Sequence, residues 1–221
     1  MDIKLVIFDF DGTIADTRKA IVVAKQKTMK KLGLEVMDEE ACASTIGLSA
    51  KRGFQATYPE MSEEKLDECV STYRSIFEEI KEKYPPTLFP DVVETLEWLK
   101  EKGIVTTIAT SRNNASLKEF LARLGLAQYF SYALGGQDTE QLKPHPEPVL
   151  KTLRDLSFEA DQTLVIGDMW MDIEMGKGAG VYTCGVTYGN SDREQLSRAG
   201  ADYVFDRMSE IKSIWEAPLH C

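Results

Sequence analysis

The sequence contains little cysteine, little histidine and no long apolar stretch. Its 221 residues include four cysteines and two histidines. Cys42, Cys69, Cys184 and Cys221 are scattered, without C-x-x-C spacing and without the density of a disulfide framework. No apolar stretch approaches the roughly 20 residues that span a bilayer. These absences argue against a disulfide-stapled or membrane-spanning protein and favour reduced thiols in a reducing compartment.

Basic residues are also scarce relative to acidic ones. Lysine and arginine number 26 against 36 aspartates and glutamates, which gives a formal net charge of −10. Such a charge repels the phosphate backbone of nucleic acids and anionic membrane surfaces, so neither is an expected partner. The first residues, Asp2-Ile3-Lys4-Leu5, show no secretory signal. We therefore expect a cytoplasmic protein.

The composition is that of a globular chain, with 43% hydrophobic and 28% charged residues. Short apolar segments rich in β-formers predict strands at 4–8, 104–109, 163–166, 181–186 and 202–205. Helical patterns lie between them, one capped by Asp91 and ending at Gly103, another following Asn114 and ending at Gly125. This alternation predicts an α/β fold with a doubly wound, mainly parallel Rossmann-like sheet.

Residues 17–87 differ from the rest because they contain helical patterns and no convincing strand. The clearest helix runs from Ser62 to Tyr84, with apolar residues at steps of three and four. Pro85, Pro86 and Pro90 then break the pattern. We expect residues 17–87, including a hinge, to form an inserted helical cap domain, and residues 1–16 and 88–221 to form the Rossmann-like core.

Two carboxylates follow the first predicted strand in the segment Asp9-Phe10-Asp11-Gly12-Thr13. Gly12 permits the tight turn that would bring both acids to one point. Asp-Gly pairs are also frequent turn formers, so this segment alone leaves a simple capped turn open.

Other predicted strands end in polar residues too. Thr110-Ser111 and Gly167-Asp168 each close a strand, and parallel strands present their carboxyl ends at one ligand-binding edge. Asp172 follows Asp168 by four residues, which allows both side chains to face the same site. Clustered carboxylates need a cation, which Lys143 can supply in part. Hard oxygen ligands with a partly open shell predict Mg²⁺ as the metal.

In this order along the chain, the motifs resemble those of the haloacid dehalogenase superfamily, in its phosphatase branch with a C1-type helical cap. The resemblance covers essentially the whole chain and is strongest to phosphoglycolate phosphatases. It implies an Mg²⁺-dependent phosphatase acting on a small phosphorylated metabolite. A phosphosugar mutase of the β-phosphoglucomutase type and an inorganic pyrophosphatase remain alternatives. A non-enzymatic, phosphate-responsive binding module is a remote alternative, since such a module needs neither Asp11 nor a helical insertion.

The resemblance also implies residue roles. Asp9 would attack phosphorus to form an aspartyl-phosphate, and Asp11 would act as general acid and then as general base. Mg²⁺ would be held by Asp9, the backbone carbonyl of Asp11 and Asp168, with Asp172 orienting the shell. The residues implied to bind the phosphoryl group are Gly12, Thr110, Ser111 and Lys143.

Substrate choice in this branch comes mainly from the cap. The segment 45–52 resembles a specificity loop, and Lys51 or Arg52 could bind a substrate carboxylate. Both could equally belong to a solvated helix face. Arg112 follows Thr110-Ser111 and should lie near the site, as a substrate contact or in a salt bridge to the cap. The sequence leaves the oligomeric state open between monomer and homodimer.

Overall fold

The computed structural model describes residues 2–216 and is built around a six-stranded sheet in the order β5-β4-β1-β6-β7-β8, with every pair parallel. The strands are β1 (Leu5–Phe8), β4 (Val105–Ala109), β5 (Tyr132–Leu134), β6 (Thr163–Gly167), β7 (Tyr182–Val186) and β8 (Tyr203–Phe205). The predicted parallel α/β sheet is confirmed. Strand β5 is an addition, because its three residues are too few to form a recognisable pattern.

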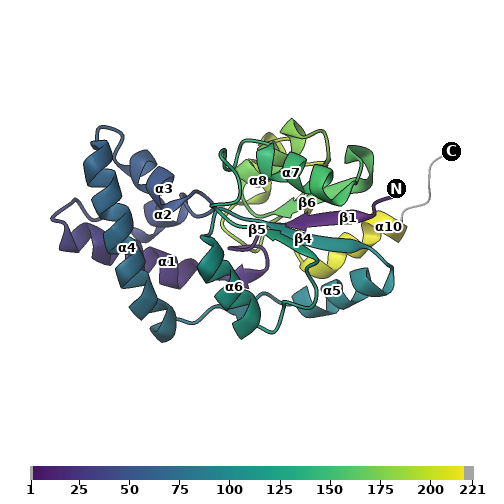
Figure 1. Cartoon of the computed structure of the whole chain (residues 1–221), viewed down its shortest axis with the longest axis horizontal. Helices are drawn as coiled ribbons and strands as arrows, with labels where there is room; N and C mark the ends of the chain where they lie inside the picture. Colours follow the sequence, from purple (N-terminus) through teal and green to yellow (C-terminus); the bar gives the residue numbers. More distant parts are fainter. Residues whose placement is uncertain (1, 217–221) are drawn as a thin grey trace.

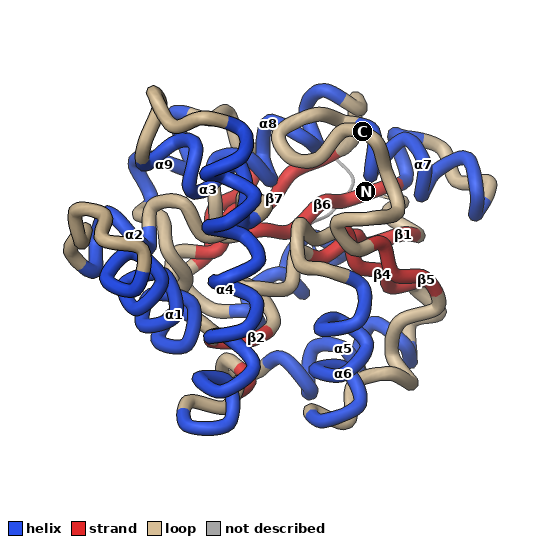
Figure 2. Tube along the Cα trace, turned by 60° about the vertical axis from the view of Figure 1, so that its left-hand side comes forward, coloured by secondary structure: helices blue, strands red, loops and turns tan. Residues whose placement is uncertain are grey.

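Helices cover both faces of this sheet. They are α5 (Val92–Glu101), α6 (Asn114–Arg123), α7 (Glu147–Leu156), α8 (Trp170–Gly178), α9 (Arg193–Arg198) and α10 (Ser213–Glu216), with 3-10 turns η1 (Ala160–Gln162) and η2 (Met208–Lys212). In Figures 1 and 2, α7 and α8 lie on one face and α5 and α6 on the other. Side chains of β1 alternate between the two: Leu5 and Ile7 enter one core cluster, Val6 and Phe8 the other. Burial on both faces explains why β1 is a continuous apolar segment.

A helical unit, defined here as residues 18–83, lies between β1 and the rest of the sheet in the chain. It comprises α1 (Arg18–Lys31), α2 (Glu39–Ala43), α3 (Ala50–Thr57) and α4 (Glu63–Lys83). Figure 1 places these helices at the left, on the side toward which β1 runs. The chain enters through β2 (Ala15–Asp16) and leaves through β3 (Thr87–Leu88), which pair antiparallel. The division into domains at residues 17 and 87 stays a prediction.

Two helix starts illustrate how local sequence acts. Ser62 caps α4 as its type predicts, accepting a hydrogen bond from the Lys65 amide at 3.3 Å. Asp91 precedes α5 but makes no capping hydrogen bond, and its φ is +65°. Its carboxylate instead accepts hydrogen bonds from Arg207 and Ser209. The expected cap at Asp91 was therefore wrong, because these distant donors hold the carboxylate against η2.

The cysteines that the structure describes form no disulfide. Cys42, Cys69 and Cys184 are free and buried, whereas Cys221 lies outside the part of the chain that the structure describes. Among residues 2–216, no helix combines the length and the apolar character needed to cross a membrane.

Candidate active site

Three adjacent strands end at the candidate site. Asp9 follows β1, Thr110 follows β4 and Asp168 follows β6, while β1 pairs with both of the other strands. The chain order reverses at β1, so this edge is the topological switch point at which ligands bind in open α/β sheets. All three residues are buried, with Asp168 fully inaccessible.

Asp9, Asp168 and Asp172 form a carboxylate cluster in which one oxygen of each lies within 4.8 Å of the others. Burial raises the pKa of Asp9 well above its ordinary value. Burial, followed by the charge of Asp172, raises the pKa of Asp168 to about 7. The crowded carboxylates therefore need positive charge beside them to stay ionised.

Lys143 provides part of that charge. Its Nζ lies 2.5 Å from Asp9 Oδ1 and 2.6 Å from Asp172 Oδ1, and its side chain is only 1% exposed. Burial alone would lower the pKa of Lys143, but the carboxylates of Asp172 and Asp9 outweigh it and raise the pKa. One ammonium group thus faces three carboxylates.

The cluster fits a further cation. Asp9 Oδ1 is paired with Lys143, whereas the buried Oδ2 accepts no hydrogen bond from any residue that the structure describes. Buried oxygens without donors are unusual unless a ligand binds them. Oxygen donors of this kind suit hard divalent cations, so Asp9, Asp168 and Asp172 are able to bind a metal ion.

Two glycines allow the backbone to approach these carboxylates. Gly12 has a φ of +91°, and a Cβ there would lie 2.2 Å from Asp168 Oδ2. At Gly167 a Cβ would lie 2.2 Å from the Cβ of Asp172. Asp172 is in the first turn of α8, where its Oδ2 accepts the Met169 amide at 3.0 Å. The glycines are required because side chains would occupy the space of the carboxylates.

Asn190 belongs to the site but was missed by the sequence reasoning. Its backbone N and its Nδ2 both donate to Asp168 Oδ2 at 2.8 Å. Arg18 Nη1 in turn donates to Asn190 Oδ1 at 3.2 Å, and Arg18 Nη2 binds Glu40 in α2. The signal was available, because Asn190 follows β7 and so lies at the same sheet edge as the predicted residues.

Asp11 is held by Arg112 and Thr17. Arg112 donates from Nη2 to Oδ1 at 2.5 Å and from Nε to Oδ2 at 3.0 Å, and Thr17 Oγ1 donates to Oδ1 at 2.6 Å. The guanidinium also lies over the rings of Phe120, Phe77 and Phe10, at 4.5, 5.3 and 5.8 Å from their centroids. Because Phe77 belongs to α4, Arg112 connects the loop after β4 to both Asp11 and the helical unit.

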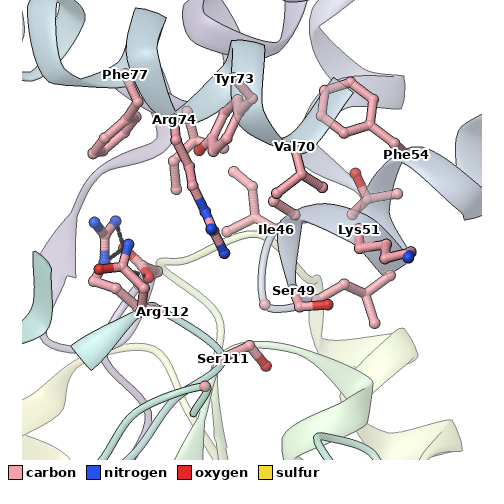
Figure 3. Close-up of a pocket in the computed structure, with 18 of the residues that line it drawn as sticks. Ile46, Ser49, Lys51, Phe54, Val70, Tyr73, Arg74, Phe77, Ser111 and Arg112 are labelled. Atoms are coloured by element: carbon pink, nitrogen blue, oxygen red, sulfur yellow. Dashed lines mark hydrogen bonds and ion pairs between the residues drawn. The ribbon is translucent and has the colours of Figure 1, made fainter. Parts of the chain in front are cut away.

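A cavity of about 410 Å³ lies between the strand ends and the helical unit. Asp11, Thr110, Ser111 and Arg112 line its sheet side, called here the floor. Figure 3 shows Ser111 and Arg112 opposite the residues of α4. Thr110 Oγ1 accepts the Arg112 amide at 3.3 Å, which leaves its proton available. The Ser111 hydroxyl has no hydrogen-bond partner among the described residues. Both hydroxyls are therefore able to donate to a ligand in the cavity.

The cap residues singled out from the sequence have other partners. Lys51 lines the cavity, but its Nζ lies 2.7 Å from carboxylates of both Glu63 and Asp67. Arg52 Nη1 donates to the backbone carbonyls of Leu142 and Lys143, at 3.4 and 3.2 Å. Arg52 thus connects the helical unit to the loop that carries Lys143, and a substrate contact by either residue stays a prediction.

Known proteins resemble this chain in sequence and in fold. A family model described as haloacid dehalogenase-like hydrolase matches residues 6–186. The probable phosphatase IndB of Dickeya dadantii is 36% identical, over 94% of this chain and 91% of its own length. The phosphoglycolate phosphatase of Aquifex aeolicus is 32% identical, over 96% and 97%. The crystal structure of a predicted phosphatase from Clostridium acetobutylicum superimposes with a TM-score of 0.89 and 26% identity, covering 98% of this chain and all of that one.

The family model covers the chain from within β1 through the helical unit to the end of β7, and so includes every residue of the carboxylate cluster. The relatives match over nearly their full lengths, so the likeness extends to the helical unit and the sheet together. This chain therefore belongs to the haloacid dehalogenase-like hydrolase family.

Proposed function

We propose that this family member is a magnesium-dependent phosphatase that hydrolyses a small phosphorylated metabolite through a phosphorylated Asp9. The observation that carries the proposal is the Asp9 carboxylate at the end of the central strand: Lys143 Nζ contacts its Oδ1, and no described residue donates a hydrogen bond to its buried Oδ2. An oxygen free of donors is available as a nucleophile. The likeness to a protein named phosphoglycolate phosphatase supports a substrate of that size and charge.

The chemistry divides between two carboxylates. In the first step an Asp9 oxygen attacks phosphorus while Asp11 donates a proton to the departing oxygen. In the second step Asp11 accepts a proton from the water that attacks the phosphorylated Asp9, which releases inorganic phosphate. Asp11 lines the cavity floor, where a leaving group would lie. Phosphoryl oxygens would be bound by Thr110, Ser111, Lys143 and the turn at Gly12.

Mg²⁺ would be held by Asp9, Asp168 and the backbone carbonyl of Asp11, with Asp172 orienting the shell. When bound, the metal supplies charge neutralisation to the transferring phosphoryl group. The three buried carboxylates of the cluster outnumber the single ammonium group of Lys143, which supports a bound cation. Asn190 and Thr13 would fix the orientation of Asp168, since both donate hydrogen bonds to it.

The proposal extends to the setting of the enzyme. Residues 17–87 would act as a cap domain that covers the cavity, which its shared lining by α3, α4 and the strand-end loops supports. Buried free thiols in the described chain support a reducing, cytoplasmic compartment. Activity is expected from a monomer or a homodimer.

Two alternative enzymes would use the same phosphorylated Asp9. They differ from the proposed phosphatase either in the acceptor of the phosphoryl group or in the leaving group. A phosphosugar mutase returns the phosphoryl group to a sugar, and an inorganic pyrophosphatase uses phosphate as the leaving group. A binding module without catalysis would need no proton donor. The position of Asp11 in the cavity floor supports an enzyme over such a module.

The test is phosphate release from phosphoglycolate, hexose phosphates, nucleotides and pyrophosphate, with Mg²⁺ or a chelator, by wild type and Asp9→Asn. We expect metal-dependent turnover that the nearly isosteric substitution abolishes while circular dichroism stays unchanged. Activation by a bisphosphorylated sugar without steady phosphate release would indicate the mutase. Equal turnover by Asp9→Asn would overturn the nucleophile assignment, and no turnover of any substrate would overturn the phosphatase.

A further inference from the structure

Arg74 is a cation of the cavity without a partner among the described residues. It projects from α4 into the space above Ser111 and Arg112 (Figure 3). Neither a hydrogen bond nor an ion pair joins it to another described residue. The sequence carried a signal for it, because Arg74 lies one turn from Val70 and from Phe77, on the border of the apolar stripe of this helix.

Lys25 is a second cation of the same cavity, contributed by α1. Its side chain is buried, and its Nζ donates to the Cys42 carbonyl at 2.9 Å and to Thr45 Oγ1 at 2.5 Å. Both partners are neutral, and an ammonium group has three protons to donate. Burial lowers the pKa of Lys25 to about 8, so the group is still mostly charged at neutral pH. One donor of a buried cation is thus left for a ligand.

The other charged residues of the cavity are already paired. The acids that line it have cationic partners, in the pairs Asp11–Arg112, Asp67–Lys51 and Glu78–Lys81. These pairs also use the remaining cations of the lining, Arg112 and Lys51. Within the described lining, the two cations on α1 and α4 are therefore left without a carboxylate, although the whole chain carries a large negative charge. An anionic ligand would balance them.

We propose that Arg74 and Lys25 form a subsite for a second anionic group on the substrate, either a carboxylate or a second phosphoryl group. The inference rests on the proposed function and adds that the substrate carries a second negative charge. The scissile phosphoryl group lies at Asp9, and the second anion lies across the cavity, against the helical unit. Substrates with an anion at both ends are therefore preferred over monophosphates of neutral alcohols and sugars.

A matched pair of substrates tests the carboxylate. 3-Phosphoglycerate and glycerol 1-phosphate share a three-carbon skeleton and differ in whether its far end is a carboxylate or a hydroxymethyl group. In Arg74→Met we expect kcat/KM to fall about tenfold or more for 3-phosphoglycerate, because a charge-assisted hydrogen bond is lost, and to stay within about twofold for glycerol 1-phosphate. Arg74→Lys should recover part of the loss. Pyrophosphate tests a second phosphoryl group in the same way.

Lys30→Met is the matched control, because it removes one exposed positive charge from the same helical unit at a position away from the cavity. We expect it to leave both substrates unaffected. Equal losses on the two substrates in Arg74→Met, or no loss on any doubly anionic substrate, would overturn the subsite.

Binding to the Asp9→Asn variant separates this inference from the proposed function. Calorimetry of 3-phosphoglycerate, pyrophosphate and glycerol 1-phosphate needs no turnover. We expect the doubly anionic ligands to bind more tightly and to lose that advantage when Arg74→Met is added. If the wild type hydrolyses nothing but this difference persists, the phosphatase proposal fails and the subsite stands. If no ligand shows a difference, the subsite fails whether or not the enzyme is a phosphatase.

Discussion

Arg112 binds the Asp11 carboxylate through two hydrogen bonds, from Nη2 to Oδ1 at 2.5 Å and from Nε to Oδ2 at 3.0 Å. The two side chains are 6% and 10% exposed. The guanidinium also lies over the Phe120 ring. The same group therefore makes a cation–π contact and donates two hydrogen bonds to Asp11. Lysine has neither the plane nor the fork, which makes arginine specific at this position. The proposed proton donor is therefore oriented by a neighbour that also touches α4.

Replacing Arg112 by methionine should destabilise the folded protein. The substitution leaves the buried Asp11 carboxylate with Thr17 as its remaining side-chain donor among the described residues, so we expect the free energy of unfolding to fall by about 3 kcal/mol. Arg112→Lys keeps the charge but loses the second contact and should give a smaller loss. Urea unfolding of the wild type, Arg112→Met and Arg112→Lys measures both losses in unfolding free energy. Unfolding free energies equal to wild type for both variants would contradict a structural role for this pair.

Gly12→Ala should disrupt the carboxylate cluster. The new Cβ meets Asp168 Oδ2 at 2.2 Å and Asn190 Nδ2 at 2.6 Å, at a φ of +91°. We expect the free energy of unfolding to fall by about 2 kcal/mol or more and phosphate release to be lost. Gly33→Ala is the control, because its φ is +66° and no described atom lies within 4 Å of the added Cβ. It should cost about 1 kcal/mol and leave turnover intact; equal effects of the two substitutions would contradict the clash.

Divalent metal should stabilise the wild type through the carboxylate cluster. At an Mg²⁺ concentration about 100 times Kd, binding adds about 2.7 kcal/mol, which corresponds to an increase in Tm of roughly 5–10 °C for a chain of this length. Asp168→Asn removes one ligand and should reduce that increase. Thermal unfolding with Mg²⁺ and with a chelator makes the comparison. An identical increase in both proteins would place the metal elsewhere.

Lys25 should give the stability a measurable pH dependence. Burial lowers its pKa from 10.5 to about 8, whereas the unfolded chain keeps the ordinary value. Between these values the unfolded state binds more protons, so the destabilisation caused by burying the ammonium is relieved as pH rises. Relative to Lys25→Met, which cannot titrate, the wild type should gain about 2 kcal/mol between roughly pH 7.5 and 9.5. Urea unfolding across this range measures the difference, and a constant difference would refute the shift.

The sequence predicted those features that buried strands and their ends determine. β1 is a continuous apolar segment and β6 is apolar in its centre because helices cover both faces of the sheet, while β4 contains two threonines among its apolar residues. Each of the three strands ends beside a polar residue of the site. Once a parallel sheet is inferred, Asp9, Thr110 and Asp168 must meet at one edge. Helix α4 was also predictable from the sequence, because its apolar stripe and its Ser62 cap are local signals.

Features that depend on partners far apart in the chain were out of reach. Arg112 and Asp11 are 101 residues apart, and nothing in their spacing shows that they pair. The position of Asn190 after β7 places it at the right sheet edge, but nothing in the sequence shows that its side chain binds Asp168. Asp91 has the composition of a cap, but its carboxylate is bound by Arg207 from the far end of the chain. Local propensity yields to such tertiary contacts.

The antiparallel pairing of β2 with β3 bears on how such a protein can be assembled from parts. Asp16 lies opposite Thr87, so the two points at which the chain crosses between sheet and helical unit are neighbours. A short hairpin turn joining them would close the sheet portion without altering its strand order or register. The intervening segment thus has the layout of a module inserted into a loop, so that its length and sequence can change without moving the residues at the strand ends.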